Sequence, residues 1–197
     1  DSDNRVVANA ISSLRSFPAG PVVERIKPFC MSGNNRIRAN AIIALWGKPS
    51  APPPSDLREA IRSMLFSERQ AECVSALYAI GEIHDREMIG DIETLYKRNE
   101  EKIRRDTYLF NSILHAVQKM PDERAVAFIL TLCETDSRKR RKEITTALTR
   151  IIDYGYPIGK LAPALVESNY IVRDTIIDAL YTSGSTIENA VAASVVQ

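Results

Sequence analysis

The amino-acid sequence predicts an all-α protein, an α–α superhelix or solenoid of about six helical-hairpin repeats. A twelve-residue pattern recurs at positions 3–14, 34–45 and 169–180, with similar residue types slot by slot. Its last slot holds a leucine at near-constant spacing along the chain, at Leu14, Leu45, Leu77, Leu114, Leu148 and Leu180. A repeat of this length accommodates two helices of ordinary length and two short turns.

The apolar slots of the pattern have the spacing of a helix. Ile37, Ala41 and Leu45 follow one another at intervals of four residues, whereas a strand would alternate apolar and polar residues. Each helical pair has one apolar face that a lone hairpin leaves in water. We therefore expect neighbouring pairs to stack and bury it in a continuous core.

Turn and capping residues set the expected boundaries. Pro28 should kink or shorten its helix, and Ser55, Asp85 and Thr186 are placed to cap helices. The prolines between positions 48 and 54 favour a stiff connector over a ligand for a proline-binding domain. The expected helices cover 3–15, 21–31, 34–46, 55–66, 67–83, 86–99, 101–120, 123–134, 137–152, 158–167, 169–182 and 187–196.

Composition excludes some classes of protein. The net charge is +1, so no global charge draws the chain to nucleic acid or to an anionic membrane. No apolar run approaches the roughly 20 residues that span a bilayer, so we expect no membrane insertion by this segment and a cytoplasmic location.

The chain opens on Asp1, and both ends carry half-repeats. We expect residues 1–197 to be a single repeat domain from a longer protein.

The pattern resembles the HEAT repeat, in the short form common in bacterial proteins and also found in phycobilin-lyase-like proteins. The pairs Ile37-Arg38 and Val172-Arg173 match its aliphatic–Arg pair, and 76–85 and 120–125 resemble its helix end and its start. The copies near Arg69-Gln70 and Asp106-Thr107 depart from it. The resemblance implies that second helices line a concave surface that binds other macromolecules. It also implies that Arg38, Arg141 and Arg173 pair with acidic residues of neighbouring repeats.

Four of the six residues in the third slot are basic and suggest a ladder along one edge of the second helices. The basic members are Arg5, Arg36, Arg105 and Lys139, beside Glu68 and Ile171. One interpretation is a groove for an acidic segment of a partner protein. The alternative is a solvated helix start, although basic residues there oppose the helix dipole.

Two basic clusters keep a nucleic-acid hypothesis open. One is the run at 138–142, and the other lies one repeat earlier, near 97–105. A helix spreads five consecutive residues around its axis, so the run does not form one flat patch. The phosphate contacts of this alternative would come from Arg104, Arg105, Arg138, Lys139 and Lys142.

The remaining candidates are few. Trp46, the only tryptophan, either covers the edge of the core or anchors a partner. The two histidines are isolated, and no phosphate-binding loop or nucleophile motif is present, so we expect no metal site, no cofactor and no enzymatic activity. The three cysteines are widely spaced and fit small buried side chains.

These observations together favour a protein–protein interaction or scaffold module. Its partner would be another protein or another domain of the same parent chain, bound through Arg5, Arg36, Arg105, Lys139 and Trp46. The nucleic-acid alternative has the HEAT-like alkylpurine glycosylases as its precedent. A third alternative, binding of a tetrapyrrole, follows from the phycobilin-lyase resemblance.

Overall fold

The computed structural model describes residues 3–18, 20–167 and 169–195, without the side chains of 135–139 and 167. The prediction of an all-helical protein is confirmed: helices make up 81% of the described residues, against the third that is usual in globular proteins. No strand occurs within the described ranges. The chain divides into two compact units, Asp1–Asn99 and Glu100–Gln197.

The first unit contains paired helices joined by short turns. Its elements are α1 (Asn4–Ser13), η1 (Leu14–Ser16), α2 (Gly20–Ile26), η2 (Lys27–Met31), α3 (Asn35–Leu45), α4 (Pro54–Leu65), α5 (Gln70–Ile83), η3 (Arg86–Met88) and α6 (Ile89–Arg98). As expected, α2 stops before Pro28, and the chain continues as the 3-10 helix η2.

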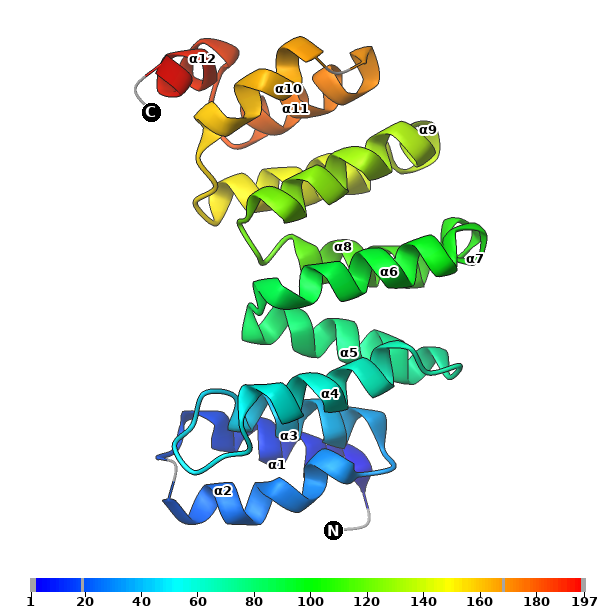
Figure 1. The fold of residues 1–197 in the computed structure, drawn as a ribbon, viewed down its shortest axis with the longest axis vertical. Coiled ribbons are helices and arrows are strands. Elements are labelled where there is room, and N and C mark those ends of the chain that lie inside the picture. The colour runs from blue at the N-terminus through cyan, green and yellow to red at the C-terminus, as the bar shows by residue number, and fades with distance from the viewer. Residues whose placement is uncertain (1–2, 19, 168, 196–197) are drawn as a thin grey trace. The chain divides into compact units, whose positions relative to one another are not determined.

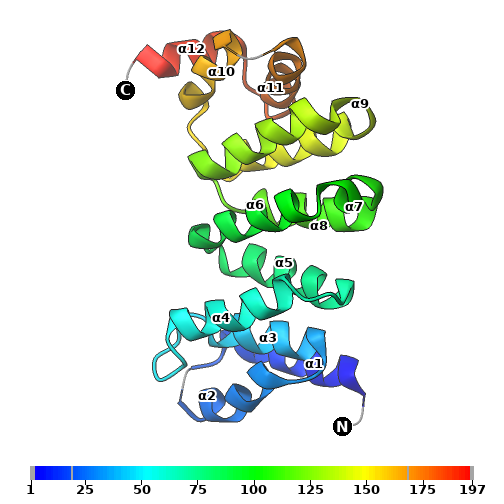
Figure 2. The same cartoon turned by 45° about the vertical axis from the view of Figure 1, so that its right-hand side comes forward.

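Helices α1, α3 and α5 form the inner layer of this unit. α3 packs against α1 on one side and α5 on the other, while α2, η2 and α4 cover it (Figures 1 and 2). Being surrounded, α3 buries side chains on more than one face, including Ala39, Ile42 and Leu45. The second helices of successive pairs thus lie side by side, an arrangement like that of helical-repeat proteins.

The second unit continues the alternation of packed helices. Its elements are α7 (Glu100–Arg105), α8 (Thr107–Val117), α9 (Glu123–Asp153), η4 (Ile158–Leu161), α10 (Ala162–Glu167), α11 (Tyr170–Thr182) and α12 (Ile187–Val195). α9 packs against both α8 and α11, α10 packs against α11, and α12 packs against η4 and α10.

Helix α9 is a run of 31 helical residues that doubles back on itself. Both views show its two halves side by side (Figures 1 and 2). A straight helix of this length would span about 46 Å, yet the Lys160 ammonium, just beyond its end, pairs with Glu123 at its start. We call residues 123–134 the first arm and residues 140–153 the second arm. The sequence predicts separate helices over 123–134 and 137–152, whereas the structure has one helical run whose arms cover most of both ranges.

Three copies of the twelve-residue pattern begin with the same capping device. Asp3, Asn34 and Asn169 each precede a helix in extended conformation and accept backbone N–H bonds through the side chain. Asn34 accepts two, from Arg36 at 3.1 Å and from Ile37 at 3.2 Å. The first slot of the pattern is therefore an N-cap, which satisfies donors that the helix itself leaves without partners.

The Asn34→Ala variant is expected to lose about 1 kcal/mol of unfolding free energy, because two backbone donors of α3 lose their acceptor. Urea unfolding followed by circular dichroism measures the loss. Asn9 lies inside α1 and is exposed, so Asn9→Ala should be neutral or slightly stabilising through helix propensity. Equal stability of Asn34→Ala and the wild type would contradict the capping role.

Several expected helix boundaries are wrong, and the helix expected from position 67 begins at Gln70. α4 begins at Pro54 with Pro53 at the N-cap, so Ser55 lies inside the first turn and does not cap the helix. Proline fits this first turn because its missing N–H would have no partner there. The helix expected over 101–120 is interrupted at Asp106, which ends α7 and caps α8 by accepting the N–H of Leu109 at 2.9 Å.

Candidate partner-binding surface

Two adjoining depressions cross α8, the second arm of α9 and α11 in the second unit. The first has a volume of about 590 Å³ and the second about 340 Å³, and both are lined by Lys142 and Thr146. We call the combined surface the threonine groove. Its other lining residues are Asn111, Leu114, His115, Gln118, Arg141, Glu143, Thr145, Thr149, Asp178 and Thr182.

The threonine hydroxyls of this groove are oriented by their own helices. Thr146 donates to the carbonyl of Lys142 at 2.8 Å, Thr149 to that of Thr145 at 2.9 Å, and Thr182 to that of Asp178 at 2.7 Å. A hydroxyl whose proton is committed in this way still has lone pairs that accept hydrogen bonds. The groove wall formed by α9 and α11 therefore presents acceptor oxygens.

The opposite wall, on α8, adds amide and imidazole groups. Asn111 and His115 of α8, and Gln118 at its C-cap, line the groove beside Lys142. The Gln118 amide nitrogen and the His115 Nδ1 lie 2.9 Å apart. Lys142 is exposed, and no ion pair is found for it within the described part of the chain. The amide groups of this wall, together with Lys142 of the second arm, therefore add hydrogen-bond donors to the groove.

The described side chains of the basic run, those of residues 140–142, do not form a continuous patch. The Arg140 guanidinium is buried 4.2 Å from the centre of the Phe110 ring and donates to the carbonyl of Arg104 at 2.6 Å. Arg141 pairs with Asp178 at 2.7 Å, and Lys142 enters the groove. The expectation that a helix would disperse this run is confirmed for these three residues. The side chains of Arg138 and Lys139 lie outside the described set.

In the proposed ladder of basic residues, only Arg5 and Arg36 occupy the same position relative to the start of a helix. Arg5 and Arg36 are both exposed and both follow an N-cap by two residues. Arg105 instead ends α7, one residue before the cap of α8, and Glu68 precedes the cap of α5. The leucine-based alignment is therefore wrong in these two copies, because the helix starts follow the caps and not the leucines.

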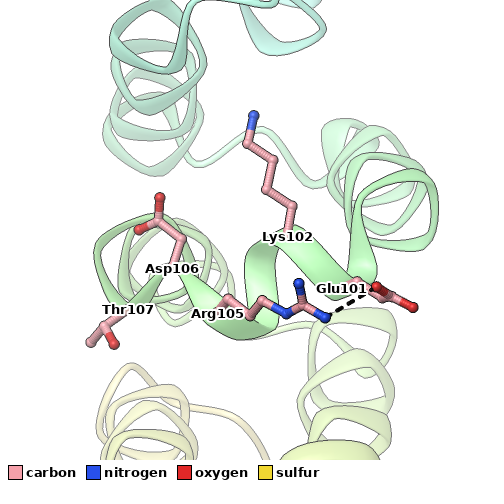
Figure 3. A pocket seen from close by; sticks show the side chains of 5 residues that line it. All are labelled: Glu101, Lys102, Arg105, Asp106 and Thr107. Atoms are coloured by element: carbon pink, nitrogen blue, oxygen red, sulfur yellow. Dashed lines mark hydrogen bonds and ion pairs between the residues drawn. The ribbon is translucent and has the colours of Figure 1, made fainter.

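Arg105 lies in a wide depression at the corner between α7 and α8, of about 680 Å³. Figure 3 shows its guanidinium reaching toward Glu101, with the nitrogen and oxygen 3.5 Å apart, while Lys102 projects away from this pair. Asp106 and Thr107 line the opposite side (Figure 3). Arg104 likewise pairs with Glu100 at 3.4 Å. Two of the three predicted phosphate-binding arginines, Arg104 and Arg105, therefore have a carboxylate partner on their own helix.

Trp46 lies at the end of α3 and is half-buried. The Arg58 guanidinium lies over its ring, 5.7 Å from the centroid, and is itself bound by the buried Asp85 carboxylate at 2.6 Å. Such a stacked, ion-paired arginine shields one face of the indole. This geometry favours the interpretation of Trp46 as a cover for the edge of the core.

Among the described side chains, the pairing implied for the repeat arginines is a direct ion pair only at Arg141. Arg141 contacts Asp174 and Asp178 of α11, at 3.7 and 2.7 Å. Arg38 instead donates to the Ser63 hydroxyl at 2.7 Å and to the carbonyl of Ala60. Arg173 is exposed, with no ion pair inside the described ranges. The acidic neighbour of Arg38 is Glu72 of α5, whose pKa is lowered by a hydrogen bond from Ser67 and, in part, by the Arg38 charge. For Arg173, the described side chains include no acidic partner.

The cysteines behave as small buried side chains. Cys30, Cys73 and Cys133 are all buried, and none of them forms a disulfide. Burial raises the pKa of Cys30 to about 11 and that of Cys133 to about 11, so both thiols remain protonated at neutral pH. Among the described residues, no cluster of His, Cys, Asp or Glu has the arrangement of a metal site. Nor does any helix described here have the length and apolar character to cross a membrane.

Sequence reasoning did not identify the groove threonines. Their signal was available, because Thr145 and Thr149, and likewise Asp178 and Thr182, are four residues apart on one face of a second helix.

The comparisons with models of known protein families and with curated proteins find no match for this chain. The function must therefore be argued from the surface itself.

Proposed function

We propose that this protein is a HEAT-like solenoid module that binds an extended segment of a partner protein in the threonine groove. The observation that carries the proposal is that the two depressions share Lys142 and Thr146 and so cross three successive second helices. In HEAT-like repeats the second helices are the expected binding surface. The side-by-side inner helices of the first unit support the same architecture.

The chemistry of the groove suits the main chain of an extended peptide. Such a peptide presents N–H donors and carbonyl acceptors in alternation and needs partners of both kinds. The Thr146, Thr149 and Thr182 oxygens accept the N–H groups. Lys142, Asn111 and Gln118 donate to the carbonyls. Lys142 has no acidic partner among the described side chains, so an Asp or Glu of the peptide is the favoured neighbour for its ammonium.

A nucleic acid fits this surface less well. Counterion release requires several unpaired cations that neutralise phosphates together. Here Arg140 is buried, and Arg104, Arg105 and Arg141 each contact a carboxylate. The groove also contains Glu143 and Asp178, which repel phosphate. We therefore propose a protein as the partner.

Peptide selection on the purified chain tests the groove. Twelve-residue peptides displayed on phage are selected on the wild type, and their dissociation constants are measured by fluorescence polarisation. Thr146→Arg places a long cation at the centre of the groove and should weaken binding at least about tenfold, which corresponds to about 1.4 kcal/mol. The measurement is repeated with Lys142→Glu. This variant should weaken the binding of peptides that contain an acidic residue more than the binding of other peptides.

Thr131→Arg is the matched control. Thr131 lies on the first arm of α9, is exposed, and donates to its own i−4 carbonyl as Thr146 does. This variant should bind every selected peptide as tightly as the wild type. Peptides that bind Thr146→Arg as well as the wild type would refute the groove. Tight DNA binding with a steep salt dependence that Lys142→Glu abolishes would favour the nucleic-acid alternative instead.

A further inference from the structure

A second polar pocket, of about 460 Å³, lies in the second unit where the start of α9 meets η4, α10 and α12. Its volume is within the range of small-molecule sites, roughly 300–1,000 Å³. It shares no lining residue with the threonine groove. The lining residues are Glu123, Tyr156, Gly159, Lys160, Pro163 and Ser194.

The pocket wall depends on a close approach of two backbones. A Cβ atom at Gly159 would lie 2.7 Å from the carbonyl carbon of Ala193 and 2.8 Å from the amide nitrogen of Ser194. Only glycine lets α12 pack this closely on η4. The contact fixes Ser194 beside Lys160 on the pocket lining.

Tyr156 provides a phenol hydroxyl without a hydrogen-bond partner in the described structure. Its side chain is only 6% exposed and lines the pocket, and its hydroxyl is not among the fully enclosed polar atoms. Buried hydroxyls are normally paired, so a hydroxyl that opens only on a cavity indicates a ligand or a water there. Burial raises the pKa of Tyr156, with smaller contributions from Glu123 and Asp122, so the hydroxyl stays a neutral donor.

Two other polar groups of the pocket carry opposite charges, one on Lys160 and one on Glu123. The Lys160 ammonium pairs with the Glu123 carboxylate, and both side chains are substantially exposed, at 41% and 69%. An ion pair this exposed is weak and readily exchanges its partners. The Ser194 hydroxyl donates to the carbonyl of Val191 at 2.7 Å, so its oxygen is left as an acceptor.

We infer that this pocket binds a free α-amino acid. Its carboxylate would lie between the Lys160 ammonium and the Tyr156 hydroxyl, and its ammonium between the Glu123 carboxylate and the Ser194 oxygen. Each ligand charge then meets the opposite charge and one neutral hydrogen-bonding group. A simple anion would meet the Glu123 carboxylate, and a simple cation the Lys160 ammonium, so the zwitterion is the complementary form.

Titration by nuclear magnetic resonance tests this inference with L-alanine as the probe. The backbone amides of Gly159, Lys160 and Ser194 should shift and reach saturation. Acetate and methylammonium carry one charge each and should bind at least about tenfold more weakly. Tyr156→Phe retains the ring but loses the hydroxyl, and should weaken L-alanine binding about tenfold, as expected for a hydrogen bond to a charged group.

Tyr154→Phe is the matched control, because Tyr154 is an exposed tyrosine two residues away and does not line the pocket. It should bind L-alanine like the wild type. If Tyr156→Phe disturbs the fold, Lys160→Gln is the second variant, and it should weaken the binding of L-alanine at least about tenfold. Three results would each overturn the inference: no saturable shift with L-alanine, acetate binding as tightly as L-alanine, or unchanged affinity in a folded Tyr156→Phe variant.

Discussion

The Arg140→Ala variant is expected to lose about 2–3 kcal/mol of unfolding free energy. Arg140 is buried, stacks on Phe110 and donates to the carbonyl of Arg104, which lies in the last turn of α7. A desolvated cation–π contact contributes about 2 kcal/mol and a charge-assisted hydrogen bond about 1.5–3 kcal/mol. The loss is smaller than their sum because alanine also removes the cost of burying a charge.

Denaturant unfolding of matched variants checks this expectation. Arg140→Lys keeps the charge but has neither the planar group that stacks on the ring nor its fork of donors, and should lose at least about 1 kcal/mol. Arg150→Ala is the control, because Arg150 is exposed on the same arm of α9 and should change stability by less than about 0.5 kcal/mol. Equal stabilities of Arg140→Ala and Arg150→Ala would show that the buried guanidinium does not stabilise this contact.

The Gly159→Ala variant is expected to destabilise the packing of α12 by about 1–3 kcal/mol. The three atoms that would meet the new Cβ belong to the backbone of Ala193 and Ser194, so no side-chain rotation can relieve the clash. α12 must therefore move away from η4. Hydrogen exchange of the α12 amides should accelerate about tenfold or more, while exchange in α3 stays unchanged.

Gly33→Ala is the control for the general effect of replacing glycine. No atom lies within 4 Å of a Cβ at Gly33, so the substitution should be neutral, or stabilising by up to about 1 kcal/mol through the unfolded state. If Gly159→Ala leaves α12 exchange at the wild-type rate, the close approach of the two backbones does not hold α12.

The sequence predicted the features that depend on neighbouring residues. The predicted caps at Asp85 and Thr186 and the break at Pro28 follow from hydrogen-bond donors and ring geometry within one turn, and all three are present. Capping also explains why the leucine-based alignment is wrong in the repeat copies that end at Leu77 and Leu114. Helix α8 starts directly after Asp106, whose carboxylate accepts a backbone N–H of the first turn. The spacing of leucines contains no information about the position of this hydrogen bond.

The features that decide the candidate sites depend on residues far apart in the chain. Arg140 belonged to a charge cluster in the sequence, and only the approach of Phe110 and Arg104 made it a buried residue. The tight contact of Gly159 with α12, and the pocket that Tyr156 shares with Glu123 and Ser194, likewise arise from segments more than 30 residues apart. A single sequence contains no direct signal for such contacts.

The position of Trp46 makes the two halves of the chain separately observable. It is the only indole in the sequence, and it belongs to the unit Asp1–Asn99, where Arg58 stacks on it. Its fluorescence therefore follows melting of that unit alone, whereas far-ultraviolet dichroism averages over both. Coincident curves would identify a single cooperative transition, and curves with separate midpoints would identify two units that melt independently, without any added dye.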